Sequence, residues 1–151
     1  MSKMFILFSK FIEDEMVFRV KKGVIRTPDY QKLRATTGWD IFHDKVVERS
    51  LSADLFSVSF YDGDEIIGCG RVIGDGLMYF YIQDIIVAPE YQKKGIGTKI
   101  MLEIENFLKK RTVNNSFIGL MAAKEVREFY RKFGYSERSP ERPGMCKIIK
   151  K

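Results

Sequence analysis

The length and composition of the chain are those of a single globular domain. Its 151 residues are 45% hydrophobic and 30% charged, a balance that disordered and fibrous sequences lack. The apolar run at residues 4–8 is too short for a signal-peptide core or a membrane span, so we expect a cytoplasmic protein. Two cysteines and one histidine supply neither a disulfide framework nor metal-ligand spacing. The net charge of +6 suits a nucleic acid, a membrane surface or a phosphorylated molecule, but no nucleic-acid-binding motif accompanies it.

The first third of the chain predicts one strand and two helices. Residues 1–15 could form an N-terminal extension or an added edge strand, and the pattern does not distinguish the two. Residues 16–20 alternate as a strand does. Pro28 favours a helix start, and this helix should end near Gly38. Asp40 is a candidate cap for a second helix, whose apolar stripe we expect to be Ile41, Phe42, Val46, Val47 and Leu51.

The middle of the chain predicts three strands joined by tight turns. Residues 55–61 and 65–73 flank a hairpin turn, and residues 74–76 form a second turn before a strand at 79–87. Strands joined in this way should be antiparallel. A helix then follows, whose buried stripe we expect to be Ile96, Ile100, Met101, Ile104, Phe107 and Leu108.

The last third predicts a short strand within residues 116–121, a helix that ends at Gly134, and final strands near Tyr135 and at residues 145–149. Because no internal repeat or flexible linker interrupts this mixed order, we expect one three-layer α/β domain.

The turn between the strand at 79–87 and the next helix has the properties of an anion site. The first N–H groups of a helix have no partner within the helix, and Gly95 and Gly97 let a charged group approach them closely. Lys93 and Lys94 add positive charge, so a phosphorylated ligand is expected. The P-loop pattern is absent, and Ile100 stands where a dinucleotide fingerprint needs its third glycine.

Two motifs identify a family. The pattern Val87-x-Pro89-x-x-Gln92-x-x-Gly95-x-Gly97, between an apolar strand and an amphipathic helix, resembles the central motif of the GNAT superfamily of N-acetyltransferases. Residues 129–135, Phe-Tyr-Arg-Lys-Phe-Gly-Tyr, resemble a second GNAT signature. The resemblance covers residues 17–151. It implies a single three-layer GNAT-like domain over residues 16–151, with a mixed, mostly antiparallel central sheet flanked by helices.

The resemblance implies acetyl-CoA as co-substrate and no metal. Backbone groups of Ile85, Ile86 and Val87 would pair with the pantetheine arm, and an N–H of the same strand would bind the thioester oxygen. The pyrophosphate would be held at the turn and the helix start, by Gln92, Lys93, Lys94, Gly95, Ile96, Gly97 and Thr98.

The resemblance also assigns catalytic roles. Tyr130 matches the tyrosine that acts as general acid on the departing thiolate in many GNAT enzymes. Tyr81 and Gln83 stand where relatives often carry a glutamate or histidine base, so no side-chain base is assigned. Asp84 could bind a cationic amine, pass its proton through water, or tie down a loop. Trp39 is more often a packing residue than a ligand contact, but its place between the two helices makes it, with Tyr81 and Gln83, a candidate acceptor contact.

We therefore expect an acetyl-CoA-dependent N-acetyltransferase that moves the acetyl group directly to a primary amine on a small molecule. The alternatives are a protein N-terminal or lysine acetyltransferase and a non-catalytic acyl-CoA-binding regulatory module. We expect no nucleic-acid or membrane partner, and exposed sheet edges are compatible with a homodimer. The identity of the amine does not follow from the sequence, because specificity depends on the shape of the pocket.

Overall fold

A computed structural model describes residues 17–150, and the predicted N-terminal extension at residues 1–15 lies outside these described residues. The chain divides into two compact units. The first ends at Gly119, and the second begins at Leu120.

The first unit is built on one mixed sheet. Its strands are β1 (Arg19–Lys22), β2 (Phe56–Asp62), β3 (Glu65–Gly74), β4 (Tyr79–Val87) and β5 (Phe117–Gly119). They lie in the order β1-β2-β3-β4-β5. Neighbours are antiparallel from β1 to β4, whereas β5 pairs with β4 in parallel. This arrangement confirms the predicted mixed, mostly antiparallel sheet.

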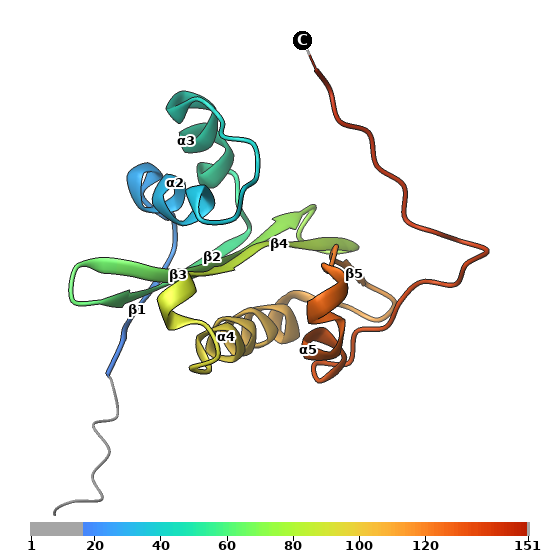
Figure 1. The fold of residues 1–151 in the computed structure, drawn as a ribbon. Coiled ribbons are helices and arrows are strands. Elements are labelled where there is room, and N and C mark those ends of the chain that lie inside the picture. Colours follow the sequence, from blue (N-terminus) through green and yellow to red (C-terminus); the bar gives the residue numbers. More distant parts are fainter. Residues whose placement is uncertain (1–16, 151) are drawn as a thin grey trace, which may run out of the picture. The chain divides into compact units, whose positions relative to one another are not determined.

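Helices cover both faces of this sheet (Figure 1). Helices α2 (Thr27–Ala35) and α3 (Asp44–Ser52) lie on one face, and α4 (Ile96–Arg111) lies on the other. The long crossover from β4 through α4 to β5 is what makes that pair parallel, because a tight turn can join only antiparallel neighbours. The predicted three-layer α/β fold is confirmed.

The predicted stripe of α4 forms the core on its side of the sheet. Ile96, Ile100, Met101, Ile104 and Leu108 are buried, and Phe107 stacks on Phe56 with ring centroids 4.8 Å apart. Gly70 on β3 lets the helix approach closely, because a Cβ at this position would lie 2.5 Å from Ile100 Cγ2. The core on the other face joins residues of α2 and α3 to the sheet.

The helix predicted after Asp40 begins later than expected. Its N-cap is His43, whose Nδ1 accepts a hydrogen bond from the Lys45 N–H at 3.3 Å. Of the five residues in the predicted stripe, only Val47 and Leu51 are buried. The predicted stripe was wrong for Ile41, Phe42 and Val46, which are exposed. Ile41 and Phe42 precede the helix, and Phe42 and Val46 line a pocket described below.

The second unit has less regular structure than the sequence predicted. A 3-10 turn (Lys124–Val126) leads into the short helix α5 (Arg127–Arg131). Gly134 has a φ of 86°, which confirms the glycine stop. The strands predicted near Tyr135 and at residues 145–149 were wrong for the described chain, since no strand follows Gly119 up to residue 150. Pro140 and Pro143 interrupt this segment, and proline cannot donate to a ladder.

Candidate active site

A β-bulge interrupts the pairing of β3 with β4. Arg71 pairs with Gln83, but Cys69 pairs with Ile86, so Asp84 and Ile85 both lie opposite Gly70. Asp84 has a φ of 54°, a left-handed conformation that aspartate tolerates better than most residues. The extra residue bends the strand, as bulges beside functional sites often do.

The edge of β4 that faces away from β3 is only partly covered. Its pairing with β5 ends where Tyr81 meets Gly119. Beyond that point, no described strand pairs with this edge of β4, although β4 continues to Val87. The predicted cofactor residues Ile85, Ile86 and Val87 lie on this segment. Their main-chain groups could therefore pair with an extended ligand, as in strand addition.

The turn after β4 leads directly into the start of α4. Gln92 Nε2 donates to the Val87 carbonyl at 3.1 Å and closes the turn. Lys93 and Gly95 have left-handed φ values of 60° and 81°. Alternation of handedness turns successive N–H groups into a concavity that suits an anion. Among the described residues, no side chain caps the N-terminus of α4. The turn thus joins the other predicted cofactor residues, Lys94, Ile96, Gly97 and Thr98, into one continuous stretch after the open strand edge.

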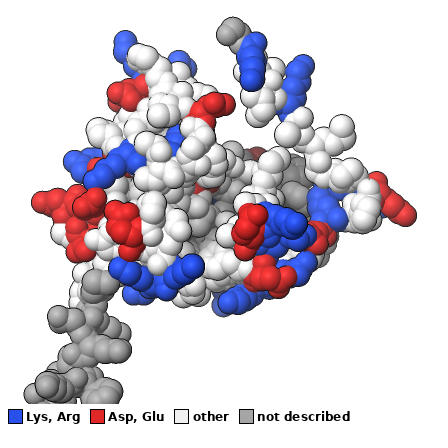
Figure 2. Space-filling view, viewed as in Figure 1, with Lys and Arg blue, Asp and Glu red and all other residues white. Residues whose placement is uncertain are grey.

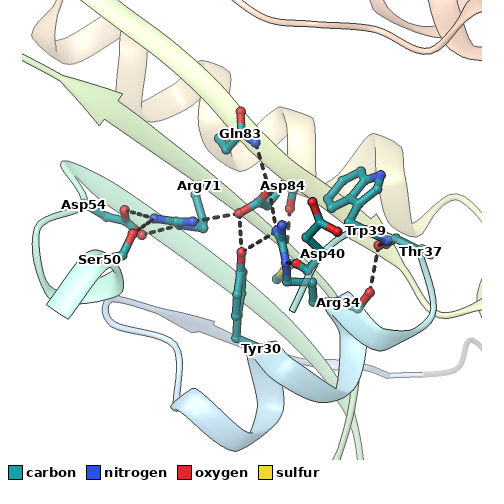
Figure 3. A network of polar contacts seen from close by, with 11 residues as sticks. Tyr30, Arg34, Thr37, Trp39, Asp40, Ser50, Asp54, Arg71, Gln83 and Asp84 are labelled. Atoms are coloured by element: carbon teal, nitrogen blue, oxygen red, sulfur yellow. Dashed lines mark hydrogen bonds and ion pairs between the residues drawn. The ribbon is translucent and has the colours of Figure 1, made fainter. Parts of the chain in front are cut away.

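Asp84 lies at the centre of a buried polar cluster (Figure 3). Its side chain is only 1% exposed. Oδ2 accepts hydrogen bonds from Tyr30 Oη and from Arg71 Nη1, each at 2.7 Å. Oδ1 accepts from Gln83 Nε2 at 3.0 Å and lies 3.7 Å from Arg34 Nη1. We call these five residues the Asp84 cluster. They tie α2, β3 and β4 together at the bulge.

Arg71 links the Asp84 cluster to the segment between α3 and β2. Its Nε and Nη2 donate to the two carboxylate oxygens of Asp54, both at 2.8 Å, and Nη2 also donates to Ser50 Oγ at 3.1 Å. Burial by itself lowers the pKa of Arg71, but the hydrogen bonds and charges of Asp54 and Asp84 outweigh it and raise that pKa. Burial and the bond to Asp84 raise the pKa of Tyr30 to about 12. Both groups therefore stay protonated at neutral pH.

A pocket of ≈ 400 Å³ opens over the Asp84 cluster. We call it the acceptor pocket, after the role that we propose for it below. Its walls come from α2, α3, β3, β4 and the connection between the two helices, and the lining residues are Tyr30, Arg34, Phe42, Val46, Val47, Ser50, Leu51, Arg71, Ile73, Gln83 and Asp84. Its volume falls within the usual range for small-molecule sites, and its lining combines apolar side chains with several polar ones.

The other predicted site residues are distributed as follows. Gln83 lines the acceptor pocket, whereas Tyr81 lies on β4 where it pairs with β5. Trp39 is 44% exposed, and its ring lies 5.4 Å from the guanidinium carbon of Arg34. Tyr130 belongs to α5 in the second unit.

Within the second unit, Tyr130 packs edge-to-face against Phe129, with ring centroids 5.1 Å apart. It also lines a local hollow of ≈ 270 Å³. Burial raises the pKa of the Tyr130 phenol, so that it carries its proton at neutral pH.

Sequence reasoning missed Tyr30, Arg34 and Arg71. One pattern could have indicated Arg71, because it stands two positions after Cys69 in β3 and therefore on the same face of the strand. An inward-facing arginine in a buried strand needs a carboxylate partner. Nothing in the local pattern shows which carboxylate.

A family model described as "Acetyltransferase (GNAT) domain" matches residues 24–144. The chain belongs to the GNAT acetyltransferase family. It is 34% identical to a structure of the Staphylococcus aureus protein SA2161, named a probable acetyltransferase, with a TM-score of 0.83 over 88% of this chain and 100% of that one.

Curated relatives agree with this assignment. The chain is 26% identical to a Gracilaria tenuistipitata protein named uncharacterized N-acetyltransferase ycf52, over 86% of this chain and 75% of that protein. It is 29% identical to histone acetyltransferase TAP1 of Glycine max, over 93% of this chain but 66% of the longer plant protein. The GNAT chain is therefore an N-acetyltransferase, and acetyl-CoA is the general donor of its family. No helix within residues 17–150 has the length and apolarity to cross a bilayer.

Proposed function

We propose that this GNAT enzyme transfers an acetyl group directly from acetyl-CoA to a primary amine on a small molecule bound in the acceptor pocket. The observation that carries the proposal is the uncovered edge of β4, which runs past that pocket and leads into the uncapped start of α4. A strand edge suits the amides of pantetheine, and a helix N-terminus suits a pyrophosphate.

The proposed reaction needs no acetyl-enzyme. The lone pair of the neutral amine attacks the thioester carbonyl carbon, the N–C bond forms, and the C–S bond breaks. Tyr130 then supplies the proton to the thiolate, the nitrogen loses its surplus proton to water, and water returns a proton to the Tyr130 phenolate. A main-chain N–H of β4 would stabilise the developing oxyanion.

For Asp84, we propose the positioning role among the three alternatives. Its carboxylate already accepts hydrogen bonds from Tyr30, Arg71 and Gln83. Arg34 lies near it as a second positive charge, so both oxygens are already engaged. Its contacts hold the bulge, and with it the main-chain groups of Ile85 and its neighbours. In this proposal Asp84 shapes the cofactor edge and does not touch the amine.

A protein acceptor is the second candidate, because one relative is named histone acetyltransferase TAP1. The surface charge neither favours nor opposes it. Figure 2 shows lysine and arginine interspersed with acidic side chains over the described part of the viewed face, without one broad basic area. The volume of the acceptor pocket favours a small amine over a polypeptide.

The test begins with calorimetric titration of the purified chain with acetyl-CoA, with ATP and NAD as comparison ligands. Selective binding of acetyl-CoA supports the cofactor site, and binding of a nucleotide instead contradicts it. Thiol release is then measured with small amines and with a lysine-rich peptide. Intersecting initial-velocity lines indicate direct transfer, whereas parallel lines indicate an acetyl-enzyme. Binding of acetyl-CoA without turnover on any amine would favour a non-catalytic acyl-CoA-binding module.

Two further expectations stay proposals. Light scattering of the purified protein tests whether it forms a homodimer. Cell fractionation tests whether it is located in the cytoplasm.

A further inference from the structure

Two hollows adjoin one another along α3. The acceptor pocket shares Val46 and Ser50 with a second, more open hollow of ≈ 380 Å³, whose other lining residues are Lys45 and Arg49. Lys45 and Arg49 are four positions apart, so they lie on one side of the helix. They occupy the row next to Val46 and Ser50. The cationic row therefore borders the mouth of the acceptor pocket.

The floor of the acceptor pocket does not favour a cation. An ammonium group near Asp84 would find both carboxylate oxygens already engaged by hydrogen-bond donors. It would also meet the guanidinium groups of Arg71 and Arg34, and like charges in a partly buried site repel strongly. Charge on this floor comes from two arginines and one aspartate, with Asp54 behind Arg71.

Arg34 keeps hydrogen-bonding capacity toward a ligand. Its Nε donates to the Asp40 carbonyl at 2.7 Å and its Nη1 donates to Tyr30 Oη at 3.0 Å. Among the described residues, none accepts a hydrogen bond from its Nη2. The guanidinium carbon lies 5.0 Å from the centre of the Phe42 ring, and the residue is 9% exposed. A guanidinium held in this way is preorganised to bind an oxyanion.

The rim cations, Lys45 and Arg49, form no ion pair within residues 17–150. Of the carboxylates on α3, Asp44 accepts a hydrogen bond from Gln31, and Glu48 lines neither hollow. Among these residues, Lys45 and Arg49 are therefore not held in salt bridges, and they can attract an anion toward the pocket.

We infer that the acceptor amine carries an anionic group, a carboxylate or a phosphate, which Arg34 binds inside the acceptor pocket while Lys45 and Arg49 attract it from the rim. The inference rests on the proposed function and narrows its substrate class. The rest of the acceptor contacts the apolar wall formed by Phe42, Val46 and Ile73.

The experiment compares amines that differ only in an anionic group. Tyrosine is paired with tyramine for the carboxylate, and O-phosphoethanolamine with ethanolamine for the phosphate. Calorimetry measures the binding of each compound to the protein loaded with CoA, and thiol release measures kcat/KM. We expect the anionic member of at least one pair to bind about 10-fold or more tightly, the range for a charge-assisted hydrogen bond.

Variants of the protein test which residues cause the preference for the anionic member of each pair. Lys45→Gln with Arg49→Gln should reduce the preference for the anionic member about 3–10-fold, mainly through KM and more strongly at low salt, because exposed charges contribute modestly and are screened. Arg34→Lys should abolish most of the preference, because lysine lacks the planar fork of donors. The control is Lys109→Gln with Lys110→Gln at the far end of α4, which removes the same charge and should leave the preference unchanged.

The outcomes separate the two proposals. Failure to bind acetyl-CoA overturns the proposed function. If acetyl-CoA binds but the amines without an anionic group bind as well as their anionic partners, or better, only the present inference is wrong. A preference that the control variant lowers as much as the rim variant also contradicts it, since the effect would then reflect net charge. If Arg34→Lys does not fold, the rim variants and the paired compounds still decide.

Discussion

Replacing Asp84 by asparagine should show what the buried charge contributes to the fold. The change keeps the shape of the side chain and the tolerance for φ near 54°. It removes the negative charge that faces Arg71 at 2.7 Å and Arg34 at 3.7 Å. In either orientation of the asparagine amide, its NH2 group would also face a hydrogen-bond donor that now bonds to Asp84. Breaking a buried ion pair in this way costs ~3–5 kcal/mol.

The lower end of that range applies here, because Arg71 keeps both hydrogen bonds to Asp54. We expect the free energy of unfolding to fall by about 3 kcal/mol. For a chain of this size, such a loss lowers the Tm by about 6–12 °C. Urea titrations followed by circular dichroism give the free energy and also the slope that shows whether unfolding remains two-state.

The control is Asp64→Asn, because Asp64 is exposed and lies 3.8 Å from Arg19. It should change stability by less than about 0.5 kcal/mol. A loss at Asp84 no larger than that of the control, with an unchanged slope, would refute the reasoning. An acceptor KM that rises in Asp84→Asn while stability is kept would instead revive direct binding of the amine.

Glycine and alanine at position 84 separate charge from backbone strain. Both remove the carboxylate, but only glycine adopts a left-handed φ without cost. Asp84→Gly should therefore be at least as stable as Asp84→Ala, the reverse of the usual order. If alanine proves more stable by 1 kcal/mol or so, the bulge is not held in the conformation described.

Three further results are expected. Gly95→Ala strains a residue whose φ is 81°, and it should weaken acetyl-CoA binding about 10-fold in calorimetry. The control is Gly63→Ala in the β2–β3 turn, where φ is 56°. This variant is also strained and should lose similar stability, but it should bind acetyl-CoA as the parent does. Tyr130→Phe should lower kcat ~10²–10⁴-fold with little change in the KM for acetyl-CoA. The kcat of the parent enzyme should fall only above pH 10, because burial raises the pKa of Tyr130. A variant with the kcat of the parent enzyme would show that Tyr130 is not the general acid. For Tyr30, the folded pKa of about 12 exceeds its ordinary value of 10.0. Its contribution to folding stability is therefore complete below pH 10 and is lost as the pH rises toward 12. The difference in stability between the parent and Tyr30→Phe should narrow over that window, and a constant difference in urea titrations would contradict the hydrogen bond to Asp84.

Local patterns predicted much of this protein. The apolar stripe of α4, the antiparallel order of β2, β3 and β4, and the glycine turn before α4 were all predicted from adjacent residues. They could be, because periodicity and permitted φ angles depend on near neighbours. Residues 124–150 show where such patterns fail, since a strand forms only where a partner strand lies beside it.

The chemistry of Asp84 depended on the tertiary structure. The sequence showed an acid beside the cofactor motif and left three roles open. Its partners Tyr30 and Arg71 lie 54 and 13 positions away, on α2 and β3. Only folding, with the bulge that sets the register of β4, brings these donors to one carboxylate. A buried charge must be matched by whatever lies nearest in space, and distance along the chain does not reveal that neighbour.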